Sequence, residues 1–308
     1  MLDSFLIVGT QVLILFILIS LGFLGGKLKL INDDGVKSMN NIMLYLVTPC
    51  VVIEAFQKPF DKELFKNLLL ALLAALIAHT LSFLIGKILI RDKDESRRIV
   101  LRFSAVFCNC GFMALPLVKA LLGSEGVFYA SAYIAIFNIL VWSFGQYAMA
   151  GKEGSFKMKK AVLNPGVIGV VIGLIFFFTS YELPYIVIQP ISFMSATNTP
   201  IPMLMIGYSI SKLDLKGILD IKGEAVALIV RLIVSPVILL GVLYALGYRG
   251  TLLTTLIVSA STPVAATTTM FSIKFNRDEK LSSKMVAVST LFSILTMTLI
   301  VGFTQYIA

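Results

Sequence analysis

Long uncharged stretches dominate this 308-residue chain. A stretch of about 20 apolar residues is long enough to cross the hydrocarbon core of a bilayer as an α-helix. Six stretches meet this requirement without a single charged residue, at 5–26, 126–151, 161–181, 183–211, 250–273 and 285–308. The chain is 58% apolar and only 14% charged. These features indicate an all-α integral membrane protein that crosses the bilayer many times.

Four weaker stretches each carry two or three charged or histidine residues, near 36–57, 64–88, 99–119 and 223–247. Counting them gives ten transmembrane helices. We interpret the first helix as retained rather than as a cleaved signal peptide, because its leading tail carries Asp3 and no Lys or Arg.

The three cysteines, Cys50, Cys108 and Cys110, all fall inside predicted spans. Cysteines in such segments behave as small apolar packing residues. We therefore expect no disulfide, no thiolate metal site and no bound cofactor.

The net charge of +9 is distributed unevenly along the chain. The odd-numbered connections between the ten helices carry 20 Lys and Arg residues, the even-numbered ones carry 5, and Arg231 lies inside a helix. Basic loops stay on the cytoplasmic side of a membrane. The charge therefore predicts topology rather than nucleic-acid binding, with both termini outside the cell membrane.

Two predicted helices are interrupted near their middle, at matching places in the two halves of the chain. One contains Gly111 and Pro116 within 104–116, and the other contains Pro263 within 259–269. A shift of about 152 residues brings Gly111 onto Pro263. With five helices in each half, the two units must cross the membrane in opposite directions, as in the inverted repeats of transporters. We predict repeats at 1–150 and 164–308, joined by a short cytoplasmic linker at 151–163.

A helix break frees backbone groups that hydrocarbon cannot satisfy, so such a break must line a polar cavity. Gly111, Pro116 and Pro263 are expected to create the breaks, because Gly tolerates unusual dihedral angles and Pro lacks an N–H. Asn109 has a carboxamide that can donate to a carboxylate, or it can cap its own helix. Cys110 lies between Asn109 and Gly111 and completes this side of the candidate substrate site.

Hydroxyl side chains crowd the second break, including Ser261, Thr262 and Thr267. Thr262 adjoins Pro263 and is our preferred solute contact, while Ser261 and Thr267 are candidates for ion coupling. A half-helix N-terminus suits an anionic ligand. The alternative is that these hydroxyls bond to carbonyls of their own helix or help helices approach closely.

Two ionisable side chains at matching repeat positions, His79 and Arg231, lie within predicted spans. Arg231 is predicted to lie about midway across the membrane, where an Arg marks a solute pathway or has a structural partner. That partner would be a helix-end carbonyl or a carboxylate such as Glu224. His79 is the only histidine, and it either titrates for coupling or is a buried hydrogen-bonding residue. Glu54 is expected at the surface.

Several of these segments resemble a known family. Residues 109–117, Asn-Cys-Gly-Phe-Met-Ala-Leu-Pro-Leu, resemble the Asn-x-Gly-Phe-x-x-x-Pro-Leu signature of the auxin efflux carrier family. That family contains plant PIN-type carriers and bacterial relatives often labelled malate or malonate permeases. Asn-Pro at 164–165, Pro263 and residues 288–296 are also similar to its patterns. The long hydrophilic central loop of the plant carriers is missing, so neither loop regulation nor auxin as the substrate is implied.

The resemblance implies a fold like that of bile-acid symporters and sodium/proton antiporters. Helices 4 and 9 would cross at their breaks. Helices 3–5 and 8–10 would form a transport domain that slides past a scaffold of helices 1, 2, 6 and 7, commonly in a homodimer. The substrates would be small organic anions.

We compared this secondary-carrier hypothesis with other function classes. The sequence lacks the motifs of common hydrolases and phosphate-binding enzymes, so we expect no enzymatic activity. A channel would be expected to carry a filter loop or charged rings. The main alternative is a sodium-coupled symporter of the bile-acid type, which the missing buried carboxylate pair makes less favourable. Substrate, direction and coupling ion, whether H⁺ or Na⁺, are not specified by the sequence.

Overall fold

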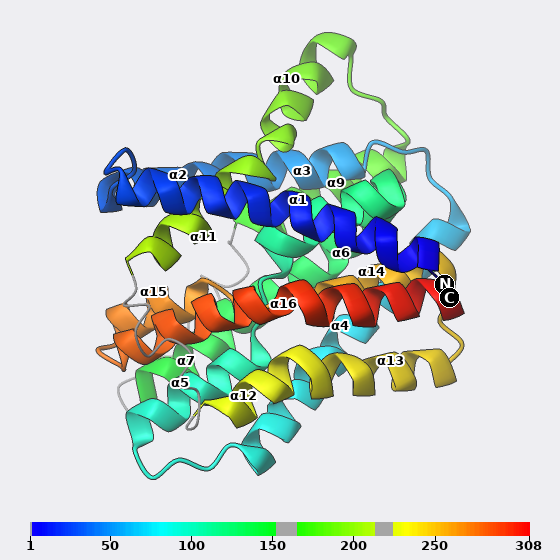
Figure 1. Cartoon of the computed structure of the whole chain (residues 1–308). Helices are drawn as coiled ribbons and strands as arrows, with labels where there is room; N and C mark the ends of the chain where they lie inside the picture. Colours follow the sequence, from blue (N-terminus) through cyan, green and yellow to red (C-terminus); the bar gives the residue numbers. More distant parts are fainter. Residues whose placement is uncertain (1, 152–164, 213–223) are drawn as a thin grey trace.

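The computed structural model of the protein describes residues 2–151, 165–212 and 224–308 (Figure 1). Within these ranges the chain is helical, apart from its loops and one isolated β-bridge. Six helical stretches there are long and apolar enough to cross a membrane: Phe5–Lys27, Asp33–Ala55, Lys62–Leu89, Cys110–Ala150, Ala225–Ala245 and Glu279–Ile307. The prediction of an all-α polytopic membrane protein is therefore confirmed, while the count of ten spans stays a prediction.

The first half of the chain contains seven α-helices and three short π-helical segments within its described residues. They are α1 (Leu2–Lys27), α2 (Asp33–Ile42), η1 (Met43–Val47), α3 (Thr48–Ala55), α4 (Lys62–Leu89), α5 (Glu95–Val106), η2 (Cys110–Ala114), α6 (Leu115–Leu140), η3 (Val141–Gly145) and α7 (Gln146–Ala150).

The second half contains eight α-helices and one π-helical segment within its described residues. They are α9 (Pro165–Thr179), α10 (Tyr185–Ala196), α11 (Pro200–Ser211), α12 (Ala225–Ile229), η5 (Val230–Val234), α13 (Ser235–Ala245), α14 (Gly250–Ser261), α15 (Thr267–Lys274) and α16 (Glu279–Ile307). The predicted linker at 151–163 falls almost wholly outside the described residues.

Three π-helical segments lie one residue short of a proline. Segments η1, η2 and η5 each end two residues before one, at Pro49, Pro116 and Pro236. Proline cannot donate a hydrogen bond, and its ring collides with the carbonyl four residues earlier. A π-helical turn changes the hydrogen-bond register locally, and such turns often occur at functional sites. The sequence analysis expected Gly111 and Pro116 to create the first break. The observed interruption lies at 107–109, so Gly111 lies inside η2 and Pro116 lies in the first turn of α6.

The fourth and fifth predicted spans meet at Gly123 without an intervening loop. Gly123 has φ 62° and ψ −152°, which interrupts the helical geometry inside α6. This conformation is strained for residues that carry a β-carbon, so glycine is needed there. Predicted span 183–211 also divides, because α10 ends at Ala196 and α11 begins at Pro200.

The centre of the molecule is formed by α6 and α14. In the most apolar part of Cys110–Ala150, 72% of the residues are buried, compared with 28% for Phe5–Lys27. Every residue of α14 from Leu252 to Ser261 is buried. The second interrupted segment therefore passes through the core, while α1 lies on the outside (Figure 1).

Helices α1 and α11 approach each other closely at two glycines. A β-carbon added at Gly207 would overlap the carbonyl oxygen of Ile19, and one added at Gly22 would overlap the carbonyl oxygen of Leu204. Small residues at membrane-helix interfaces let backbones approach and gain van der Waals contact. These glycines therefore fix α1 against α11.

Candidate substrate site at the paired helix breaks

The first break separates α5 from η2. Helix α5 ends at Val106, and Phe107 then adopts an extended conformation with φ −94° and ψ 116°. Asn109 stands immediately before η2, with φ −83° and ψ 49°. The second break separates α14 from α15. Thr262 is extended there, with φ −66° and ψ 153°, and helix resumes at Thr267.

The two breaks pair with each other as a short antiparallel β-bridge between Cys108 and Val264. The amide of Asn109 donates to the carbonyl of Pro263 over 2.8 Å, and the amide of Ala265 donates to the carbonyl of Phe107 over 3.0 Å. Buried backbone groups need partners, and in a membrane those partners must come from the protein. Each break therefore satisfies part of the backbone that the other exposes.

Helix α16 supports the second break through Ser289, whose hydroxyl accepts a 3.0 Å hydrogen bond from the amide of Val264. The same hydroxyl donates to the carbonyl of Val286 over 3.0 Å. Ser289 was not among the predicted site residues, although it lies in the 288–296 segment that carries the family resemblance.

Arg231 lies in η5, is 1% exposed, and contacts both broken helices. Its Nη1 donates to the carbonyls of Ala105 and Val106 over 3.3 and 3.1 Å. Its Nη2 donates to the carbonyl of Ala260. These carbonyls belong to the last turns of α5 and α14, which lack helical partners and carry the negative end of the helix dipole. The guanidinium thus caps both helices, as in the structural interpretation of Arg231, while its Nε is buried without a partner among the described residues.

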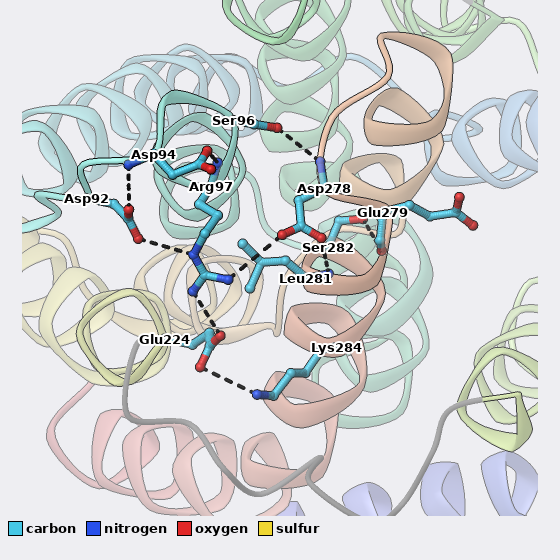
Figure 2. Close-up of polar contacts among 10 residues, drawn as sticks. All are labelled: Asp92, Asp94, Ser96, Arg97, Glu224, Asp278, Glu279, Leu281, Ser282 and Lys284. Atoms are coloured by element: carbon cyan, nitrogen blue, oxygen red, sulfur yellow. Dashed lines mark hydrogen bonds and ion pairs between the residues drawn. The ribbon is translucent and has the colours of Figure 1, made fainter.

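Glu224, the carboxylate considered for Arg231, pairs with other cations (Figure 2). Its Oε1 lies 3.2 Å from Nη2 of Arg97, and its Oε2 lies 3.5 Å from Nζ of Lys284. Arg97 also contacts Asp92 at 3.3 Å and Asp278 at 3.8 Å. This group, the Arg97 network, connects the N-terminal ends of α5 and α16 with the residue preceding α12.

Asn109 keeps its side chain available. It is 5% exposed, yet within the described residues its carboxamide neither caps η2 nor makes another hydrogen bond. A β-carbon added at neighbouring Gly111 would meet no atom within 4 Å, so space is open beside this break. Cys110 is fully buried, and its side chain is therefore less accessible to a solute than that of Asn109.

The hydroxyls at the second break divide into two groups. Thr262 is fully buried and donates to the carbonyl of Ser259 over 2.8 Å, so its hydroxyl is engaged by its own helix. The hydroxyls of Ser261 and Thr267 are buried and have no hydrogen-bond partner within the described ranges. Orphaned buried hydroxyls are costly, so a bound ion, water or solute would be favoured beside them.

His79, on α4, packs against the first break. Its ring centroid lies 6.1 Å from that of Phe107 and 5.3 Å from that of Tyr133. The hydroxyl of Tyr133 lies 3.9 Å from Sγ of Cys108. Nδ1 lies 2.7 Å from the carbonyl of Ala75 and must carry the proton, because a carbonyl only accepts. The buried Nε2 has no partner in the described part of the chain.

Sequence comparisons agree with a transport role. A family model described as "Membrane transport protein" matches residues 7–301. An uncharacterized transporter of Methanocaldococcus jannaschii is 25% identical, covering 94% of this chain and 96% of its own length. A second uncharacterized transporter, from Methanothermobacter thermautotrophicus, is also 25% identical, over 94% and 95% of the two chains.

A third relative, from Rhizobium meliloti, is described as a "Putative malonate transporter". It is 23% identical, over 93% of this chain and 92% of its own. Since the family model covers nearly the whole chain, the protein belongs to the membrane transport protein family, in which the auxin efflux carriers fall, and the resemblance deduced from residues 109–117 is confirmed.

Proposed function

We propose that this protein is a secondary transporter of small organic anions, in particular carboxylates of the malonate, malate or auxin-like type. The observation that carries the proposal is the pairing of the two breaks beside an unengaged carboxamide, Asn109. Paired broken helices suit one enclosed site rather than a continuous pore. The name of the Rhizobium meliloti relative supports a carboxylate as the cargo.

The proposed mechanism is elevator-type alternating access in a 5+5 inverted repeat of ten helices. The predicted transport domain comprises helices 3–5 and 8–10, which correspond to α4–α7 and α12–α16. The Arg97 network supports this grouping, because it connects three of its elements at one end. The scaffold comprises helices 1, 2, 6 and 7, and the close α1–α11 contact at Gly22 and Gly207 supports it.

Within the site we assign Asn109 as the principal carboxylate contact. Gly111 leaves room for the solute, and Pro263 supplies the carbonyl that holds Asn109 in place. Cys110 and Thr262 contribute through backbone groups, because their side chains are buried or engaged. Arg231 adds positive charge behind the bridge, where it lowers the electrostatic cost of an anion.

Coupling to protons is the first of two candidates, and His79 supports it. A proton on Nε2 would place a second positive charge beside Phe107 and Cys108, near Arg231. Binding of an anion would offset the repulsion between these charges, so proton and anion uptake would favour each other.

Coupling to sodium, as in bile-acid symporters, is the second candidate. The unpartnered hydroxyls of Ser261 and Thr267 support it, because oxygen ligands are those that hard cations prefer. No carboxylate stands among the described residues of either break, which makes this alternative weaker.

We further propose that the protein resides in the cell membrane as a homodimer with both termini outside. The apolar side chains of Tyr185, Ile186 and Phe193 project from α10 with 75%, 81% and 66% exposure. Such a surface must be covered by lipid or by a second subunit. Crosslinking of a cysteine introduced at position 186 would distinguish the two.

Proteoliposome uptake tests the function directly. Radiolabelled malonate, malate, pyruvate and an auxin-like acid should be offered under imposed pH, sodium and voltage gradients. We expect saturable uptake of at least one carboxylate, accelerated by a proton or a sodium gradient. Absence of carboxylate uptake by folded protein under every gradient would contradict the proposal.

A further inference from the structure

A second candidate site lies in a cavity about two helical turns beyond the first break. The cavity has a volume of about 230 Å³ and lies between α1, the start of α6 and the residue preceding α11. Three polar side chains line it, those of Gln11, Lys119 and Thr199, among apolar neighbours that include Pro116. At 1.5 Å per residue, Pro116 is roughly 10 Å along the chain from Asn109.

Among the described residues, Lys119 is the only charged one that lines this cavity. Its Nζ lies 3.3 Å from Oε2 of Glu54, and its side chain is 52% exposed. The other carboxylate oxygen of Glu54 accepts a 2.7 Å hydrogen bond from the hydroxyl of Ser192. Glu54 belongs to α3 and Ser192 to α10, so Lys119 is held at a junction of three helices.

We propose that this cavity is a vestibular carboxylate site, in which Lys119 exchanges the carboxylate of Glu54 for that of a solute on its way to the helix breaks. The inference rests on the proposed function and names a second binding position for the same class of substrate. Gln11 and Thr199 would donate hydrogen bonds to the solute, and Lys119 would supply the charge. At about 30 Å³ per water molecule, the cavity of about 230 Å³ has room for roughly eight waters, enough for a small dicarboxylate.

The energetics of the ion pair suit such an exchange. Solvent-exposed ion pairs contribute only about 0–1 kcal/mol, so a second carboxylate can displace Glu54 from Lys119 at small cost. Ser192 remains as a partner for Glu54 during the exchange.

The exchange also couples the vestibule to movement of the proposed transport domain. Lys119 lies on α6, in that domain, whereas Glu54 and Ser192 lie on elements of the proposed scaffold. The resting ion pair therefore joins the two domains, and a bound carboxylate would release this contact. An anion in the vestibule would thus free the transport domain to move.

Equilibrium binding of labelled malonate to purified protein in nanodiscs, where both faces are accessible, tests the proposal. Lys119→Gln should weaken binding about fivefold, the equivalent of about 1 kcal/mol, and Lys119→Arg should restore most of it. Glu54→Gln should strengthen binding, because the competing carboxylate is gone. Lys62→Gln, which removes an exposed charge that does not line the cavity, should bind as wild type does.

The test depends on whether Lys119→Gln and Glu54→Gln change malonate binding in opposite directions. If the ion pair were only structural, Lys119→Gln and Glu54→Gln would alter binding in the same direction or leave it unchanged, and either result would overturn the proposal. Binding and uptake by wild-type protein are measured in parallel. If wild type neither binds nor transports any carboxylate, the proposed function and the vestibular site both fail. If wild type does both and Lys119→Gln matches it, the vestibular site alone is wrong.

Discussion

The backbone amide of Asn109 donates to the carbonyl of Pro263, which joins the middle of one interrupted helix to the middle of the other. The reciprocal bond runs from Ala265 to Phe107. Since each break supplies hydrogen-bond partners for backbone groups of the other, the side chain of Asn109 is not needed as a cap. This geometry permits one residue to have its backbone fixed and its carboxamide available to a solute.

Asn109→Ala should abolish or strongly reduce carboxylate uptake while the protein still folds. The substitution removes a hydrogen-bond donor from the solute, which costs about 1.5–3 kcal/mol when the acceptor is charged. It leaves the backbone bond to Pro263 in place. Uptake kinetics in proteoliposomes and thermal unfolding in detergent measure the two effects separately. Normal uptake with unchanged apparent affinity would show that Asn109 has no contact with the solute.

Arg231→Gln should lower thermal stability in detergent. The side chain donates charge-assisted hydrogen bonds to Ala105, Val106 and Ala260, and each such bond is worth about 1.5–3 kcal/mol. Arg231→Lys should be intermediate, because an ammonium keeps the charge but not the planar fork.

The transport properties of these two variants separate the interpretations of Arg231. Residual uptake with normal apparent affinity would agree with capping alone. If stability is unchanged while affinity falls, Arg231 serves the solute and the capping role is minor. A fully stable, fully active Gln variant would contradict both.

Predictions from sequence succeeded where local chemistry decides the conformation. Pro263 indicated an interrupted helix because proline acts on its own backbone, and helix α14 ends at Ser261, two residues before it. The first segment is also interrupted, but at 107–109, and Gly111 lies inside η2. That the two breaks lie against each other was expected only through the family resemblance, and the β-bridge between them was not expected at all. It depends on which residues meet across more than 150 positions of sequence, and spacing carries no such information.

The environment of a buried polar group was harder to predict. Of the two structural partners considered for Arg231, the helix-end carbonyls are the ones that it contacts, whereas Glu224 pairs with Arg97 and Lys284. Every residue has a backbone carbonyl, so the sequence does not indicate which carbonyls Arg231 contacts. Glu54 was assigned to the surface, where it is partly exposed, but its pairing with Lys119 was not predicted. In each case the deciding partner lies on a distant helix.

Gly207→Ala should destabilise the protein although only one methyl group is added. The new β-carbon would overlap the carbonyl oxygen of Ile19, so α1 and α11 would have to separate. Overpacking of this kind costs about 1–3 kcal/mol. Gly241→Ala is the matched control, because its β-carbon would meet nothing within 4 Å. Thermal unfolding of both variants checks the prediction, and equal melting temperatures would refute it.

Arg97→Gln should loosen one end of the proposed transport domain. The substitution leaves Glu224, which is 6% exposed, with one cationic partner instead of two. An underpaired buried charge costs about 1–3 kcal/mol or more, so stability and uptake rate should both fall. Lys93→Gln, at an exposed position of the loop that precedes α5, is the control. Faster amide hydrogen exchange in α5 and α16 would identify the elements released, and wild-type exchange there would exclude a role in joining them.

A cysteine at position 155 should react only from the cytoplasmic side. The prediction follows from the 20 Lys and Arg residues on the odd connections against 5 on the even ones. In a background with Cys50, Cys108 and Cys110 replaced by Ala, an impermeant maleimide should label it in inverted vesicles but not in intact cells.

A cysteine at position 182, on an even connection, should show the opposite pattern. Each introduced cysteine is then the control for the other, because one labelling condition must modify one and spare the other. Labelling of position 155 in intact cells would reverse the topology. Labelling of both positions from the same side would mean that an even number of spans separates them, which would remove the basis for the inverted repeat.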